Sequence, residues 1–400
     1  MKKSFLPLLV YCSLYGADVD MSTINEAMQQ NHQMHLVNQK LTELEYKKRV
    51  EANFQYYQDV FKESEKYYKK ILSQKWGKDE TRLSSKNSFT QYNDDLSSRE
   101  TIDYKKGEVV LEILDDSFFN DTKEFQKKFN HLTATTIDES FFNDPVNRIA
   151  MNFLKEKDFL KNQKRQDKSK LLNSSLFDNK IIKKEDIKHK VVDTKQGKKK
   201  ISYVVIKMVP ENLQIRAKRF KDSVHENAER FNVQDSLVFG IMQTESYFNP
   251  LARSHIPAFG LMQIVPSSAG KDSYLALYGK KRILSPNYLY NTKNNIEIGT
   301  KYIQIIQDNY LKGITDPKKL FYCTATAYNA GIGSLCKSIT GEKKITNFSK
   351  IQKEAIEKIN KMSVDELYKH LTTSSRLTHE AQNYVVKVEK NSKNYLAWDR

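Results

Sequence analysis

The hydrophobic period of this chain changes twice along its length, and these changes limit the folds open to it. Residues 22–76 repeat apolar and aromatic side chains every three or four positions, which is a helical spacing, and contain no glycine or proline. Residues 101–114 and 190–208 instead alternate apolar and polar side chains, as strands do. The helical spacing returns from residue 211 onward. We therefore predict an α+β protein with a helical and mixed α/β N-terminal region and an all-α C-terminal domain.

The same changes divide the 400 residues into four predicted parts. The parts are a signal peptide (1–17), a helical extension (18–79), a mixed α/β domain (80–210) and a helical domain (211–400). In the mixed α/β domain, we expect one hairpin from residues 101–104 and 108–114, another from residues 190–194 and 202–208, and helices within residues 121–170. The helical domain is expected to open with a basic amphipathic helix over residues 213–231.

The first residues are typical of an export signal. Met1-Lys2-Lys3 is a short basic start, and residues 5–14 are mostly apolar but too few to span a bilayer. The run that ends at Cys12 is similar to a lipoprotein signal, but Tyr11 stands where that signal takes a small residue. We expect export to the periplasm with cleavage after Gly16 or Ala17, with lipidation of Cys12 and outer-membrane association as the less favoured outcome.

The formal charge of +17 favours a polyanionic partner. Nucleic acid, anionic lipid and the stem-peptide carboxylates of peptidoglycan all fit this charge, which does not choose among them. The chain carries no motif of the recurring nucleic-acid-binding modules.

Glu245 is the candidate catalytic residue. Val238, Ile241 and Met242 precede it by seven, four and three positions, so it ends the inward face of a predicted helix. We expect Asp235 or Ser236 to be the N-cap of that helix and Asn249-Pro250 to stop it soon after Glu245. A carboxyl removed from water there should keep its proton near neutral pH, as a general acid must. Taken alone, the stretch fits a solvent-facing glutamate better, because ionisable residues are seldom buried without a role or a partner.

Further motifs change that interpretation. They are Glu245-Ser246, Gly260-Leu261-Met262-Gln263, Asn295-Ile296-x-x-Gly299-x-x-Tyr302, Ala327-Tyr328-Asn329-x-Gly331 and Tyr384-Val385-x-Lys387-Val388. In this order and at these gaps, the set resembles the soluble-lytic-transglycosylase family, closely over residues 205–400 and weakly over 85–205. The resemblance implies a lysozyme-like fold for residues 211–400, an activity that cuts the glycan strands of bacterial peptidoglycan, and no cofactor.

The resemblance also implies a reaction with a single carboxylate. Most glycosidases use two, but no second acid recurs in the motifs, and Asp272 reads as a helix-cap or surface residue. An N-acetyl sugar can stabilise its own cation through the acetamido oxygen. Glu245 would then act first as acid and later as base on the bond between N-acetylmuramic acid and N-acetylglucosamine. The product would be a 1,6-anhydro sugar, with no water consumed.

By resemblance, seven further residues bind the glycan. They are Ser246, Gly260, Met262, Gln263, Tyr328, Asn329 and Tyr384. Gly260 would allow close approach of the backbone to the sugar, or it is an ordinary turn glycine. Met262 is equally readable as a core residue. We expect His255, between the motifs, to be a surface loop residue, and the eight histidines show no zinc-like spacing, so no metal is expected.

Two matters stay open in the sequence. Cys323 and Cys336, on either side of the Tyr328-Asn329 motif, could pair in an oxidising compartment or could be small core residues. The alternatives to a lytic transglycosylase are a muramidase that admits water, a cell-wall-binding module without activity, and a nucleic-acid-binding protein supported by charge alone. The sequence names no protein partner.

Overall fold

The computed structural model describes residues 43–155, 167–254 and 258–399. The contacts divide the chain into two units between Met208 and Val209, with Asp167 belonging to the second. The expected signal peptide, Cys12, residues 18–42 of the expected extension and His255 lie outside the described residues.

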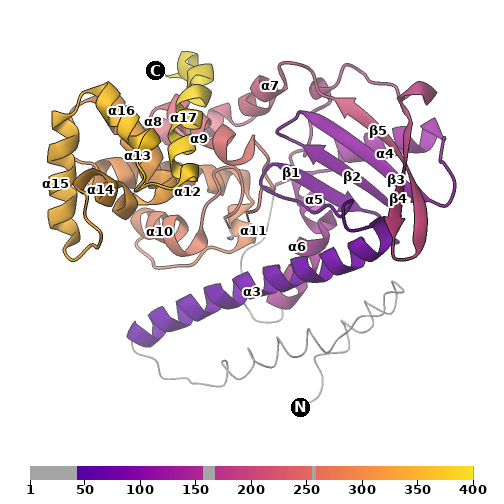
Figure 1. Ribbon diagram of the computed structural model, residues 1–400, viewed down its shortest axis with the longest axis horizontal. Coiled ribbons are helices and arrows are strands. Elements are labelled where there is room, and N and C mark those ends of the chain that lie inside the picture. The colour runs from indigo at the N-terminus through magenta and orange to yellow at the C-terminus, as the bar shows by residue number, and fades with distance from the viewer. Residues whose placement is uncertain (1–42, 156–166, 255–257, 400) are drawn as a thin grey trace. The chain divides into compact units, whose positions relative to one another are not determined.

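The first unit contains an antiparallel five-stranded sheet (Figure 1). The two predicted hairpins are confirmed, since β2 pairs with β3 and β4 pairs with β5. An edge strand, β1, was not predicted and pairs with β2. Across the sheet, the strands are β1 (Ser88–Tyr92), β2 (Ser98–Asp103), β3 (Glu108–Asp115), β5 (Gly197–Lys207) and β4 (Lys188–Thr194).

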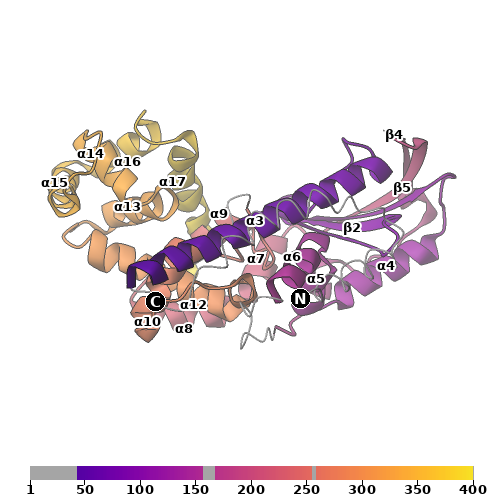
Figure 2. The same ribbon diagram turned by 90° about the horizontal axis from the view of Figure 1, so that it is seen from below.

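Helices lie on both faces of this sheet (Figure 2). On one face lies the described part of the predicted helical extension, which is one continuous helix that ends at Trp76, just before Gly77. On the other face, Lys128 of the next helix donates to Ser98 of β2, and Asn143 donates to Gln91 of β1. The helices are α3 (Glu43–Trp76), α4 (Thr122–Ala134), α5 (Ile137–Asn143) and α6 (Pro145–Lys155), with 3-10 turns at Ser174–Leu176 and Lys184–Asp186.

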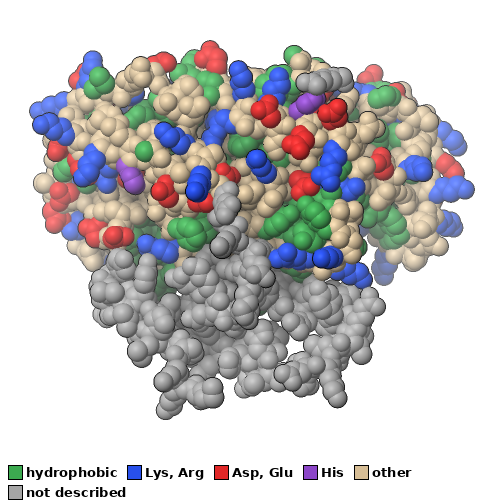
Figure 3. Space-filling model, turned by 180° about the vertical axis from the view of Figure 1, so that it is seen from behind, with side chains coloured by type: hydrophobic (Ala, Val, Ile, Leu, Met, Phe, Trp, Pro, Cys, Tyr) green, Lys and Arg blue, Asp and Glu red, His purple; other side chains and the backbone are tan. Residues whose placement is uncertain are grey.

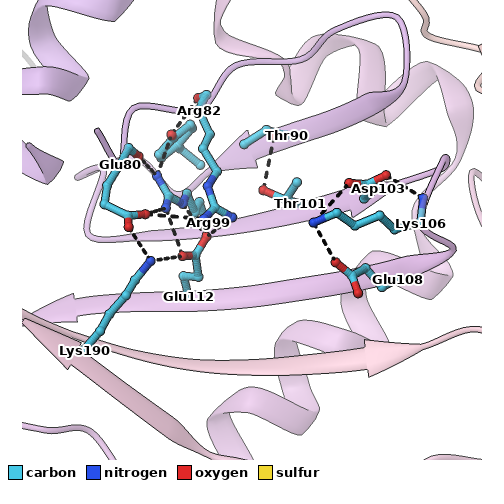
Figure 4. Close-up of polar contacts among 11 residues, drawn as sticks. Glu80, Arg82, Thr90, Arg99, Thr101, Asp103, Lys106, Glu108, Glu112 and Lys190 are labelled. Carbon is cyan, nitrogen blue, oxygen red and sulfur yellow. Dashed lines mark hydrogen bonds and ion pairs between the residues drawn. The ribbon is translucent and has the colours of Figure 1, made fainter. Parts of the chain in front are cut away.

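A buried ionic network joins the end of α3 to the sheet (Figure 4). Arg99 of β2 is fully buried opposite Glu112 of β3, with Nε 2.5 Å from one carboxylate oxygen and Nη2 2.9 Å from the other. The Arg99 guanidinium also donates to Glu80 and lies 4.1 Å from the centre of the Trp76 ring. Lys190 of β4 completes the network with a 2.6 Å hydrogen bond to Glu80. These charges hold each other in a geometry that offsets their removal from water.

The described residues of the second unit form helices, as predicted, with isolated bridges at Arg253–Phe259 and Phe259–Ile264 in place of strands. The elements are α7 (Asn212–Lys218), α8 (Lys221–Phe231), α9 (Asp235–Ser246), η3 (Pro266–Gly270), α10 (Lys271–Tyr278), α11 (Pro286–Leu289), α12 (Thr292–Ile305), η4 (Ile306–Tyr310), α13 (Pro317–Ala330), α14 (Ile332–Thr340), α15 (Phe348–Lys361), α16 (Val364–Thr373), α17 (His379–Ser392) and η5 (Lys393–Trp398).

The prediction of one helix over 213–231 was wrong. The chain bends between α7 and α8, where Phe220 leaves the helical conformation and its N–H donates to Ala217, only three residues back. The bend accompanies burial of the Phe220 ring, whose centre lies 6.5 Å from that of Phe248. Hydrophobic spacing alone does not encode this long-range ring contact.

Cys323 of α13 and Cys336 of α14 are buried as free thiols in one hydrophobic cluster with Ile306, Leu335 and Leu371. Burial raises the pKa of both thiols, to about 11 for Cys336. In the structure these cysteines are therefore core residues, which was one of the two expectations.

Basic side chains are spread over the face of the molecule shown in Figure 3, with acidic side chains among them. The +17 charge is thus not gathered into one patch on that face. Charge alone again does not identify a partner.

Candidate active site

Glu245 lies in the last turn of α9, and its side chain is buried, with 6% of the residue exposed. The helix begins at Asp235 with Gln234 as its N-cap, so neither Asp235 nor Ser236 is the cap that the sequence suggested. The cap function comes from far along the chain, because the Ser236 N–H donates to the Asp399 carboxylate at 2.7 Å. A carboxylate at a helix N-terminus stabilises the free N–H groups there.

The helix ends at Ser246, three residues before Asn249-Pro250. Tyr247 and Phe248 take the left-handed conformation, with φ of 51° and 63°. Arg216, a buried residue of α7, donates to the Tyr247 carbonyl oxygen at 2.7 Å. Left-handed backbone is costly for residues other than glycine, so this turn is held by its surroundings.

Two tyrosines from other helices face Glu245. Burial and the neighbouring Glu245 carboxylate raise the pKa of Tyr328 (α13) well above its usual value, and the same two causes raise that of Tyr384 (α17). Both phenols therefore remain protonated at neutral pH and can act as hydrogen-bond donors. The structure thus brings together one carboxylate and two neutral hydroxyls from three helices.

The Gly260–Gln263 loop is fastened to these helices through its backbone. Ser246 donates to the Leu261 carbonyl oxygen at 2.7 Å, and Tyr328 donates to that of Met262 at 2.8 Å. Ser246 is fully buried and also lies 3.0 Å from the Met242 carbonyl oxygen, so its hydroxyl is directed at backbone. The Met262 side chain is fully buried and packs where a Cβ on Gly299 would overlap its sulfur. The core interpretation of the Met262 side chain therefore matches its position.

Gly260 has a positive φ of 76°, and a Cβ there would come within 2.6 Å of the Leu289 carbonyl oxygen and would overlap the Asn295 amide. This position therefore requires glycine for two reasons, its backbone conformation and its close packing. The close neighbours are protein atoms.

Gln263 carries an unused acceptor into the site. Its Nε2 atom donates to the carbonyl oxygens of Ala252 and Gly260, both at 3.0 Å, while Oε1 is buried with no hydrogen-bond partner among the described residues. Asn329, next to Tyr328, is half-buried, and no partner of its side chain is found in the described part of the chain. Both amides are able to bind a polar ligand.

Asp272 of α10 remains apart from this group. Its side chain is 43% exposed, and its charge adds to burial in raising the pKa of Tyr302 to about 12. Tyr302 in turn lies against Tyr328, with ring centres 5.6 Å apart. Among the described residues, Glu245 is thus the carboxylate whose charge acts on both Tyr328 and Tyr384.

Asn295 is a site residue whose role the sequence did not reveal. It is fully buried on α12, its Nδ2 donates to the Phe259 and Leu289 carbonyl oxygens, and its Oδ1 accepts from the Met262 N–H at 2.8 Å. One side chain therefore binds the backbone at three places, two of them in or next to the Gly260–Gln263 loop and the third at the end of α11. Its place in the Asn295-x-x-x-Gly299 motif was the available signal.

Two family models match the chain. Residues 222–350 match the family model described as the transglycosylase SLT domain, and residues 54–219 match the N-terminal domain of membrane-bound lytic murein transglycosylase C. The protein of that name from Actinobacillus pleuropneumoniae is 32% identical over 327 residues, covering 80% of this chain and 83% of its own. The chain belongs to the membrane-bound lytic murein transglycosylase C family. A Histophilus somni relative of the same name is 30% identical and covers 81% of this chain and 84% of its own.

Membership of the membrane-bound lytic murein transglycosylase C family confirms the resemblance seen in the motifs and the predicted enzyme class, a peptidoglycan lytic transglycosylase. Among solved structures, the 70 kDa soluble lytic transglycosylase of Escherichia coli matches 45% of this chain and 24% of its own, at 21% identity and a TM-score of 0.33. The relatives are named as membrane-bound. Within the described residues of this chain, no helix is both long enough and apolar enough to cross a bilayer.

Proposed function

We propose that this chain cleaves the bond between N-acetylmuramic acid and N-acetylglucosamine in peptidoglycan without water and leaves 1,6-anhydro ends. One observation carries the proposal: Glu245 is buried, its charge acts on two tyrosine hydroxyls that stay neutral, and the adjoining loop has a free amide acceptor. Asp272, on the neighbouring helix α10, is not part of that group. Such a site suits a substrate that supplies its own nucleophiles.

In the first step, the Glu245 carboxyl gives its proton to the glycosidic oxygen as the bond to the muramic C1 breaks. The acetamido oxygen of the same sugar bonds to C1 and spreads the positive charge. In the second step, the Glu245 carboxylate takes the proton of the muramic O6 hydroxyl as O6 bonds to C1 and the acetamido oxygen leaves. Glu245 ends protonated, as it began, and the number of water molecules is unchanged.

The neighbouring side chains have distinct proposed roles. Tyr384, kept protonated by its burial, donates to the Glu245 carboxylate after the first proton transfer. The Gln263 Oε1 atom and the Asn329 amide bind sugar hydroxyl or acetamido groups. Ser246, Gly260, Met262 and Tyr328 shape the loop that carries Gln263.

We place this reaction in the periplasm, after export directed by residues 1–17. The basic and apolar start of the chain supports export, and the membrane-bound names of the relatives support an envelope location. Peptidoglycan glycan strands are then the partner available to the site.

The test is mass spectrometry of the products that the mature protein releases from purified sacculi. We expect anhydro-ended muropeptides from the wild type and almost none from Glu245→Gln. Glu229→Gln, which alters a carboxylate that is 77% exposed on α8, is the matched control and should release the wild-type products. Products one water heavier with a reducing end would identify a muramidase. No release by the wild type would identify a wall-binding module without activity.

A further inference from the structure

The last described residues of the chain pack against the helix that carries Glu245. We call five of them the C-terminal clamp: Asn391 and Ser392 at the end of α17, Tyr395 and Trp398 of η5, and Asp399. Helices α9 and α17 come so close that a Cβ on Gly240 would overlap the Ser392 hydroxyl and lie 3.1 Å from its Cβ. This contact fixes how far the two helices can slide past each other.

A polar group within the clamp holds the turn that precedes Glu245. The Gln243 amide is used at both ends, since Oε1 accepts from the Tyr395 hydroxyl at 2.6 Å and Nε2 donates to Asn391 Oδ1 at 3.0 Å. Asn391 Nδ2 then donates to Thr244 Oγ1 at 2.9 Å. One asparagine therefore binds two consecutive residues of α9, immediately before Glu245.

The clamp also holds the beginning of the same helix. Asp399 accepts the Ser236 N–H, and the Tyr395 and Trp398 rings lie 5.1 and 4.7 Å from the ring centre of Phe239. Contacts at both ends of a 12-residue helix restrict its rotation as well as its sliding.

Glu245 lies between anchored neighbours. Gln243 and Thr244 are bound by the clamp, and Ser246 is bound to the Leu261 carbonyl oxygen on the other side. Tyr384 lies on the same face of α17 as Val388 and Asn391, at the four-residue and three-residue spacing of one helical stripe. The contact between α9 and α17 therefore sets the position of Glu245 and the position of Tyr384 together.

We infer that the C-terminal clamp positions Glu245 against Tyr384, and that Asn391 and Tyr395 are positioning residues for the reaction. The inference rests on the proposed function, in which Glu245 transfers the protons. A displacement of about 1 Å in a reacting group can lower a rate by about a hundredfold. Eleven of the twelve residues of α9 are buried, so its packing retains the fold when a single clamp hydrogen bond is removed.

The experiment compares Asn391→Ala and Tyr395→Phe with the wild type, and uses Asn394→Ala as the matched control. Asn394 is an exposed residue of η5 whose backbone oxygen, and not its side chain, accepts from Gln214. For the two clamp variants we expect kcat on soluble glycan strands to fall about tenfold or more with KM unchanged. Asn394→Ala should keep both constants.

Two further measurements separate positioning from general loosening. In a Gln243→Ala background, Asn391→Ala should lower kcat by less than it does alone, because one of its two partners on α9 is already missing. Hydrogen exchange of the backbone amides at 243–248 should become faster in the clamp variants, while that of α15 should not change.

An unchanged kcat in both clamp variants, or a rise in KM with kcat unchanged, would overturn the inference. Equal losses of kcat in Asn394→Ala would do the same. If the wild type itself releases no product, the proposed function fails, and unchanged exchange at 243–248 in the clamp variants would then reject the clamp separately.

Discussion

The Tyr328 hydroxyl donates a 2.8 Å hydrogen bond to the Met262 carbonyl oxygen, and thereby ties helix α13 to the loop that carries Gln263. The Tyr384 hydroxyl, buried on the opposite helix, has no partner at regular hydrogen-bond geometry among the described residues, although the Glu245 carboxylate raises its pKa. Two tyrosines beside the same carboxylate thus differ in what their hydroxyls do. One hydroxyl holds the loop in place, and the other has no regular partner within the described residues.

Tyr384→Phe should therefore lower activity without lowering stability. Removing a buried hydroxyl that has no regular partner should leave the free energy of unfolding unchanged or raise it by about 1 kcal/mol. Loss of a donor to Glu245 should lower kcat about tenfold or more. Thermal unfolding and product release from sacculi measure the two effects. A stability loss above about 1 kcal/mol would show that the hydroxyl is structural.

Tyr328→Phe should have the opposite balance. It leaves the Met262 carbonyl oxygen without its donor, which should lower the free energy of unfolding by about 1 to 2 kcal/mol. Tyr302→Phe is the matched control, because that ring lies against Tyr328. No hydrogen bond of the Tyr302 hydroxyl is found among the described residues, so we expect a change below about 0.5 kcal/mol in urea unfolding. Equal stability losses in the two variants would contradict this account.

Gly260→Ala should separate a backbone effect from a packing effect. The new Cβ would meet Leu289 and Asn295 in addition to straining a φ of 76°, so we expect a loss of about 3 kcal/mol or more. Gly279→Ala is the control, since Gly279 has a φ of 65° and nothing lies within 4 Å of an added Cβ. Its loss should stay near 1 kcal/mol, the cost of the backbone conformation alone. Similar losses at both positions would show that the loop can yield.

The Glu80 network predicts a loss of stability in acid. Burial raises the pKa of Glu80, but the hydrogen bond and charge of Lys190, with the charges of Arg82 and Arg99, outweigh it, so the pKa lies below 4.5 (Figure 4). A depressed carboxyl pKa contributes stability that is fully present above its unfolded value and disappears as pH falls through the folded value. The stability difference between wild type and Glu80→Gln should therefore be constant near pH 7 and should shrink below about pH 4.5.

Urea unfolding of the first unit measures this difference. The chain has two tryptophans, so a Trp398→Phe background leaves Trp76, which the network contacts, as the reporter. Glu185→Gln, at a carboxylate that is 73% exposed, is the control and should follow the wild-type pH curve. A difference between wild type and Glu80→Gln that grows as the pH falls would reverse the sign of the argument.

Local patterns were sufficient for much of the fold. The hairpins around residues 105–107 and 196–198 were predicted because alternation and turn residues are short-range signals. Strand β1 was missed because its burial depends on β2, α5 and the network around Arg99, none of which five residues can reveal. The predictions of one helix through Phe220 and of the N-cap of α9 were wrong for the same reason. Both features depend on contacts with residues distant in the sequence, Phe248 for the first and Asp399 for the second.

The candidate site divides in the same way. The ordered motifs predicted Glu245 and the Gly260–Gln263 loop as parts of one site, and the hydrogen bond from Ser246 to the Leu261 carbonyl oxygen places the two stretches side by side. The motifs did not separate Ser246 and Met262, which face protein, from Gln263, which has a free acceptor. Asn391 and Tyr395 lie outside every motif, and their partner Gln243 is 148 and 152 residues away.

That separation has a consequence for the order in which the enzyme is made. Synthesis places Glu245 in the growing chain long before Asn391, so a nascent chain contains every motif up to Tyr328 while its α9 still lacks Asp399 at one end and Tyr395 near the other. A chain threaded across a membrane from its N-terminus would carry the glutamate across first and the residues that hold it last. An enzyme that cuts the cell wall would thus hold its glutamate in place only after Asn391, Tyr395 and Asp399 have crossed as well.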